Sequence, residues 1–328
     1  MTANWLRRMV MLAVCTSAAL LAGCGSSVES SLKPTRIISF GDAFSDVGNA
    51  AGGNKYTVND GTVNNWTQEV AADYGLTLAP SSTGGLGYAQ GNARITITPD
   101  AAGGTATPVT QQIDAFLASN SFQPNDLVLI NGGISDIVYQ WGTTNGVNSP
   151  AQTQAQMTAN VTQAANDLGA QVKRLVNAGA KHVIVVGPYN VSVSPWATAI
   201  GQGQVAGTTL ANNLLSNTTV QFNDALLLSI ANLGANVLYV DAAFYFNAVA
   251  YSPASYAPLV DGSDLACTLP DSGPGIGIGT GQVNSSLCTS SNAVSNYTTY
   301  MFADKLYFAP SAQRLFGDST YNKIIQRF

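Results

Sequence analysis

Short apolar runs alternate along this chain with longer amphipathic segments, a pattern that predicts a parallel sheet covered by helices. Continuous apolar runs closed by glycine or aspartate are typical of buried parallel strands, and they occupy Arg36–Phe40, Asp126–Asn131, His182–Val186 and Asn236–Val240. Apolar residues at helical spacing predict helices over Trp66–Tyr74, Thr110–Ser119, Ala151–Ala178, Thr208–Leu233 and from Pro310 toward Arg327. We therefore expect one α/β domain over residues 36–328, a three-layer α/β/α sandwich with a mainly parallel sheet.

Residues 1–23 differ from the rest and predict a lipoprotein signal peptide. Two arginines precede the apolar stretch Met9–Leu21, which is too short for a spanning helix, since that needs about 20 residues. Leu21-Ala22-Gly23-Cys24 resembles the bacterial lipobox, so we expect a lipid on Cys24 and a tether over residues 24–35. An ordinary secretory signal with a chance cysteine is the alternative. Gly25 after the cysteine favours the outer membrane as the site of this lipid-anchored envelope protein.

Charge is sparse in this chain. Charged residues make up 9% of the sequence and the net charge is −5. Because no Lys/Arg cluster lies beyond the signal, we expect no nucleic-acid partner. The single histidine, His182, opens a predicted strand, and the acidic residues show no ligand spacing. We therefore expect no metal and no cofactor.

Two cysteines, Cys267 and Cys288, lie outside the signal and the lipobox. In an oxidising compartment such a pair predicts one disulfide. It would close the Gly/Ser-rich loop Asp271–Ser286, which has little apolar material of its own.

The segment Phe40-Gly41-Asp42-Ala43-Phe44-Ser45-Asp46 resembles the nucleophile block of the GDSL (SGNH) esterases and lipases. The family has a flavodoxin-like α/β/α fold and hydrolyses esters. Its nucleophile is a serine after Gly-Asp, and here that position is Ala43.

The family's other blocks follow in the expected order. They are matched by Tyr56–Asn59 with Trp66, Gly87–Ala93, Gly133–Asp136, Asp304–Tyr307 and Gln313–Leu315. The resemblance implies that Gly91 supplies an oxyanion-hole N–H and that Ser135 stands where the family has an asparagine. It also implies that Asp304 is the retained acid, whereas Tyr307 replaces the catalytic histidine.

These replacements remove parts that ester cleavage requires. A serine hydroxyl attacks only when an imidazole takes its proton, and alanine has no oxygen to attack with. Ser45 and Ser135 are alternative nucleophiles, but we expect Ser45 to cap a helical turn, and no base is evident beside Ser135. We expect Asp304 to accept a hydrogen bond from a backbone group or from Tyr307.

Three further acidic residues of these blocks, Asp42, Asp46 and Asp136, are expected to be structural.

Three functions follow from this interpretation. The first is an exported lipoprotein that has lost catalysis and binds an acyl ester, a lipid, a glycan or an envelope partner. The second is an active carboxylic-ester hydrolase with a displaced nucleophile. The third is a structural surface protein. A pocket filled by Tyr307 and Phe308 would favour the third, and an open apolar cleft would favour ligand binding.

Overall fold

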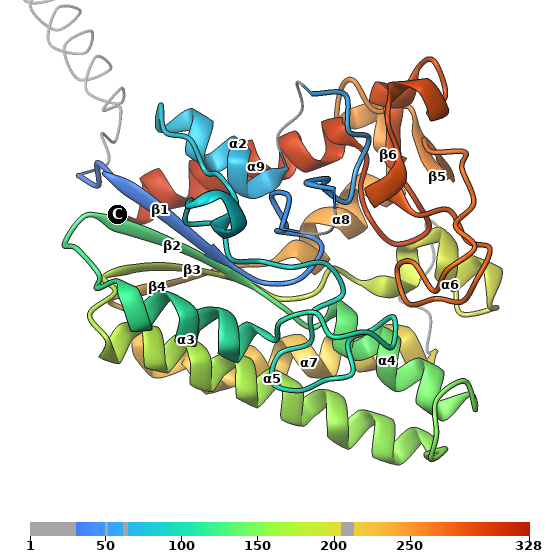
Figure 1. Cartoon of the computed structure of the whole chain (residues 1–328), viewed down its shortest axis with the longest axis horizontal. Coiled ribbons are helices and arrows are strands. Elements are labelled where there is room, and N and C mark those ends of the chain that lie inside the picture. The colour runs from blue at the N-terminus through green and yellow to red at the C-terminus, as the bar shows by residue number, and fades with distance from the viewer. Residues whose placement is uncertain (1–30, 50–51, 62–64, 205–212) are drawn as a thin grey trace, which may run out of the picture.

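The computed structural model describes residues 31–49, 52–61, 65–204 and 213–328 (Figure 1). The predicted signal peptide, Cys24 and the start of the helix expected at Thr208 lie outside these residues. In the described chain a four-stranded parallel sheet has the order β1–β2–β3–β4, formed by Arg36–Phe40, Asp126–Asn131, His182–Val186 and Val237–Val240. The predicted α/β fold with a parallel sheet is confirmed.

Helices cover both faces of this sheet. Figure 1 shows α3, α5 and α7 on one face and α2 and α9 on the other. The helices are α2 Trp66–Asp73, α3 Val109–Ser119, α4 Ile134–Thr144, α5 Gln154–Asn177, α6 Pro195–Ala199, α7 Leu214–Ile230, α8 Ala242–Tyr251 and α9 Pro310–Arg327. A small second sheet pairs β5 (Asp261–Leu265) with β6 (Tyr300–Phe302).

Short 3₁₀ helices connect these elements. They are η1 Ser81–Thr83, η2 Val191–Val193, η3 Ala231–Leu233, η4 Pro253–Ser255, η5 Ser285–Leu287, η6 Ser290–Asn292 and η7 Tyr297–Thr299.

The strand predictions agree with the structure because β1, β2 and β3 are buried on both faces, whereas the edge strand β4 is partly exposed. Every residue of β2 is buried, and Leu127, Val128, Leu129 and Ile130 are fully so. Helix ends follow local capping instead. The helix expected from Ala151 begins at Gln154, because Thr153 and Gln156 form a reciprocal capping box. The pattern gave no sign of α4, α8 or the small sheet.

The two ends of the described chain meet at one edge of the sheet. Leu32 is buried, and the N–H of Ser31 donates to the carbonyl of Phe328 at 3.2 Å. Figure 1 shows both ends beside the start of β1. No helix in the described part of the chain is long and apolar enough to cross a membrane.

The opposite edge, where the strands end, carries the segments of interest. Two of these segments directly follow strands of the sheet, residues 41–49 after β1 and residues 131–136 at the end of β2. Residues 87–95 run beside β1, and residues 303–309 follow β6 next to this edge. In open α/β sheets ligands bind at the carboxyl ends of the strands. A functional site is therefore expected at this edge.

Candidate functional site

The turn after β1 presents Ala43 at the nucleophile position of the resemblance. Gln112 of α3 fixes this turn, because its side chain accepts from Gly41 N and donates to Gly41 O, both at 2.8 Å. Asp42 Oδ1 accepts the N–H of Phe44 at 3.0 Å. Ala43 is only 1% exposed. A buried methyl group therefore stands where an esterase would need a hydroxyl.

Ser45 is not placed as the sequence suggested. It lies in a turn rather than in a helix, because its N–H bonds to Asp42 O and the chain does not continue as a helix. Its buried Oγ accepts the indole N–H of Trp66 at 3.1 Å. The expectation that Ser45 caps a helical turn is wrong, and its hydroxyl ties α2 to the first turn.

Asp304 binds backbone groups, not the side chain of Tyr307. Its carboxylate accepts the N–H of Leu306 and of Tyr307, each at 2.7 Å, and that of Ser285 at 3.0 Å. Burial raises the pKa of Asp304, and the hydrogen bonds from Ser285 and the loop oppose that rise. Asp304 therefore joins the loop 304–307 to η5, and no imidazole is there for it to orient.

Tyr307 fills space at the strand ends and cannot serve as a base. Its side chain is 1% exposed, and its ring meets that of Tyr56 edge to face with centroids 5.3 Å apart. Burial, together with the nearby charge of Asp42, raises the pKa of Tyr307 well above its usual value. At neutral pH the phenol keeps its proton.

The oxyanion-hole donor assigned to Gly91 is engaged inside the protein. Asp46 Oδ2 accepts its N–H at 2.8 Å, while Asp46 Oδ1 accepts the N–H of Gly48 at 2.8 Å. A Cβ at position 91 would clash with the phenol of Tyr56, so only glycine fits beneath this ring. The space in front of Gly91 is occupied by a side chain. The sequence placed Tyr56 in a matching block but gave no sign that it lies here.

The second oxyanion position, Ser135, lies in the first turn of α4 and is fully buried. Its Oγ has no hydrogen-bond partner in the described residues, and neither do Asp42 Oδ2 and Asn131 Oδ1. Asn131 Nδ2 donates to Asp42 Oδ1 at 2.7 Å. Burial raises the pKa of Asp42 to about 6, against the lowering effect of this hydrogen bond. Within the described residues, no imidazole or carboxylate is hydrogen-bonded to the Ser135 hydroxyl.

Asp136 is bonded away from the site, to the loop after Gly91. Its carboxylate accepts Arg94 Nε at 3.2 Å and the N–H of Ile95 at 3.1 Å. Both side chains of this ion pair are nearly buried. The pair holds residues 94–95 against α4.

An aromatic cluster completes the filling of the strand ends. Phe308 stacks on Phe246 of α8 with ring centroids 3.8 Å apart, and Phe44 packs edge to face on both. Tyr189 also packs on Phe308 and donates its hydroxyl to Leu306 O at 2.7 Å. The region around Tyr307 and Phe308 is thus packed like a core.

His182 lies at the other end of the sheet. It begins β3, its Nδ1 is 3.3 Å from Asp126 O, and its ring contacts Phe328. Because the strand ends carry Ala43 and Tyr307, this histidine is one strand length from them and cannot replace the missing base.

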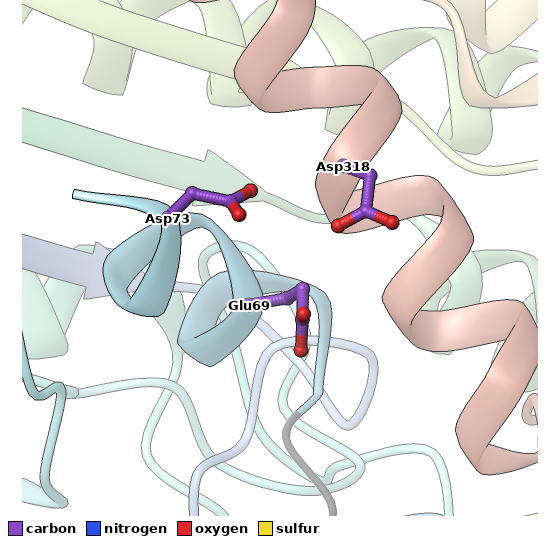
Figure 2. A group of neighbouring side chains, drawn as sticks. All are labelled: Glu69, Asp73 and Asp318. Carbon is purple, nitrogen blue, oxygen red and sulfur yellow. The ribbon is translucent and has the colours of Figure 1, made fainter. Parts of the chain in front are cut away.

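Three carboxyl groups meet between α2 and α9, a grouping that the sequence spacing did not reveal. Figure 2 shows Glu69 and Asp73 on α2 near Asp318 on α9, and their oxygens lie within 4.8 Å of one another. Partial desolvation beside α9, with the charges of Asp318 and Glu69, raises the pKa of Asp73 to about 6. Asp73 and Asp318 are exposed, and nothing at this cluster points to a bound metal ion.

The predicted disulfide joins Cys267 to Cys288 across 21 residues. It closes a loop that ends at η5, where Ser285 donates to Asp304. Asn92, beside Gly91, donates to the carbonyl of Gly275 in the same loop at 2.8 Å. The crosslinked loop therefore packs against the segment that carries Gly91.

A model of the GDSL-like lipase/acylhydrolase family matches residues 37–320 of this chain. No curated protein matches it. One solved crystal structure has 12% sequence identity and a TM-score of 0.41, over 89% of this chain and 98% of that chain.

Proposed function

The chain belongs to the GDSL-like lipase/acylhydrolase family, and from that premise we propose that it is a non-catalytic member which acts by binding. One observation carries the proposal. The nucleophile position is the buried methyl of Ala43, and the N–H of Gly91 beside it is held by Asp46 at 2.8 Å.

The remaining groups do not replace what is lost. Ser45 accepts a hydrogen bond from Trp66, and in the described chain no base is hydrogen-bonded to the Ser135 hydroxyl. Tyr307 keeps its proton at neutral pH because burial raises the pKa of its phenol. Loss of a nucleophile or base in a catalytic triad lowers turnover by about 10⁴- to 10⁶-fold.

Aromatic side chains occupy the space at the strand ends, so a ligand cannot bind at the family's catalytic position without displacing them. Tyr56 covers Gly91, and Tyr307 and Phe308 are fully packed. An acyl ester would have to displace these rings in order to reach Ala43. We therefore place ligand or partner binding elsewhere on the fold. The same filling supports a second candidate, a structural protein of the cell surface.

The cellular setting completes the proposal. Cys24 at the end of the lipobox-like sequence would carry the lipid, and Gly25 after it favours the outer membrane of a bacterial envelope. A single acyl chain gives only weak attachment, so stable anchoring needs more than one. The membrane, reached through this anchor, is one partner, and an envelope component is the other.

The catalytic part is tested with purified protein and short p-nitrophenyl esters. We expect the rate to equal that of heat-inactivated protein, and a fluorophosphonate probe to leave every serine unlabelled. A family member with serine and histidine in place serves as the positive control. A rate within about tenfold of that control, or an adduct on any serine, would overturn the proposal.

The anchoring part is tested by metabolic labelling with an alkyne fatty acid. We expect the label on the natural protein and on Cys15→Ser, and none on Cys24→Ser. The unlabelled variant should leave the membrane fraction. Equal labelling of both variants would mean that Cys24 is not the lipid site.

A further inference from the structure

A groove of about 360 Å³ lies between the loop that follows Gly91 and the helices α4 and α5. Figure 1 shows this loop, residues 92–108, running beside α4. The lining residues that matter here are Arg94, Tyr139, Gln140, Gln152, Gln156 and Asn160. None of the family's catalytic positions lines it.

Three amide side chains in the groove hold one another in place. Gln152 Nε2 donates to Gln140 Oε1 at 2.7 Å and to the Gln140 carbonyl at 2.9 Å. Asn160 Nδ2 donates to Gln140 Oε1 at 3.1 Å and to Gln152 Oε1 at 2.8 Å. Mutual bonding of this kind fixes planar groups before a ligand arrives, which lowers the entropic cost of binding.

The same network leaves a set of uncharged groups unbonded. The hydrogen bonds of the network use Gln140 Oε1 and Asn160 Nδ2, and among the described residues none involves Gln140 Nε2, Asn160 Oδ1 or Tyr139 Oη, although all three residues line the groove. They comprise a donor, an acceptor and a hydroxyl that can do either. Such a mixture matches the hydroxyl groups of a polyol, each of which both donates and accepts.

Arg94 adds a directed donor without adding net charge. Its side chain is 4% exposed, Nε bonds to Asp136 at 3.2 Å, and the guanidinium lies 4.1 Å from the centre of the Tyr139 ring. Nη1 bonds to the carbonyl of Pro99, whereas Nη2 has no partner among the described residues. Because Asp136 balances the positive charge, the groove suits a neutral ligand.

Apolar surface at the rim fits the same ligand class. Ile97 is 52% exposed beside Pro99, and both line the groove. Sugar rings present C–H faces as well as hydroxyl groups, so a mixed polar and apolar lining suits them better than it suits an acyl chain.

We propose that this groove binds a neutral oligosaccharide. The inference concerns a surface separate from the filled catalytic centre. It holds whether or not the protein hydrolyses esters, so its test and the esterase test give independent results.

The test is calorimetric titration of the full-length protein in a zwitterionic detergent, since a sugar-headed detergent would compete. The probes are maltohexaose, cellohexaose, xylohexaose and N-acetylchitohexaose, with hexagalacturonate as the charged comparison. We expect at least one neutral hexasaccharide to bind with a Kd below about 1 mM.

Two variants assign the binding to the groove. Asn160→Ala removes the free acceptor and Tyr139→Phe removes the hydroxyl while keeping the ring beneath Arg94. Each should weaken binding by up to about tenfold, the effect of one hydrogen bond. Gln163→Ala, on the same helix but outside the groove, should leave the Kd unchanged.

Four results would overturn the proposal. They are no neutral hexasaccharide binding at millimolar concentration, binding of hexagalacturonate alone, an unchanged Kd in both groove variants, and an equal loss in Gln163→Ala.

Discussion

Asp46 Oδ2 accepts the backbone N–H of Gly91 at 2.8 Å, and this bond links the turn after β1 to the segment that lies beside it. In the family to which the chain belongs, that N–H stabilises the oxyanion. Here it stabilises the fold, with the ring of Tyr56 packed over Gly91. The loss of catalysis that we propose therefore involves more than the two replaced side chains.

Restoring the two catalytic side chains should not restore an esterase. The variant Ala43→Ser with Tyr307→His regains a nucleophile and a base, but Tyr56 still covers Gly91 and Asp46 still holds its N–H. A missing oxyanion donor alone costs about 10²- to 10³-fold in turnover. We expect p-nitrophenyl acetate hydrolysis at least about 10²-fold below that of an intact family member.

Adding Tyr56→Ala to that pair is the matched comparison, since it opens the space before Gly91. Full activity in the double variant would show that the centre is intact and that our description of it as filled is wrong.

The hydroxyl of Tyr307 should be dispensable, whereas that of Tyr189 should not. Both rings are buried, but only Tyr189 donates a hydrogen bond, to Leu306 O at 2.7 Å. We expect Tyr189→Phe to lower the free energy of unfolding by about 1 kcal/mol, and Tyr307→Phe to leave it nearly unchanged. Urea denaturation of the two variants measures the difference. Equal losses would mean that the Tyr307 hydroxyl has a stabilising partner.

Removing the ring of Tyr307 should be costly. Tyr307→Ala opens a cavity at the strand ends, next to Tyr56, and large-to-small core changes of aromatic residues cost about 3–5 kcal/mol. A loss below about 1 kcal/mol would contradict the packing described here.

Asp73 should destabilise the protein above pH 6. Its pKa rises from 3.8 in the unfolded chain to about 6 in the fold, so the folded state binds the proton more tightly. Protonation of Asp73 therefore favours the folded state. This stabilisation is fully present below pH 3.8, declines as the pH rises toward 6, and is absent above that. We expect Asp73→Asn to raise the melting temperature at pH 8 and to change it little at pH 4.

The exposed Asp264 provides the control, since Asp264→Asn should shift neither melting temperature. If Asp73→Asn has the same effect at both pH values, the titration of Asp73 is not the cause.

The disulfide should stabilise the domain through its loop. Closing 21 residues lowers the entropy of the unfolded chain, which corresponds to about 3 kcal/mol. Replacing Cys267 and Cys288 together by serine should lower the urea midpoint to that of the natural protein in reductant. An unchanged midpoint would mean that contacts such as Ser285 N to Asp304 hold the loop without the crosslink.

The apolar pattern by itself determined the sheet and several helices. The strands Arg36–Phe40, Asp126–Asn131 and His182–Val186 and the helix from Pro310 have the predicted limits, because burial on both faces demands an unbroken apolar run. It did not reveal α4 or α8, each of which directly follows a strand and its turn. The motifs likewise located Ala43 and Tyr307, since the identity of one side chain needs no tertiary information.

Only the tertiary structure decided what surrounds those residues. Three contacts depend on how distant elements pack. Asp46 accepts the N–H of Gly91, and Tyr56 fills the space before Gly91. The third is the meeting of Glu69, Asp73 and Asp318 between α2 and α9. A sequence encodes periodic burial within each element, but a contact between residues on different elements is set by the angle and register at which those elements meet.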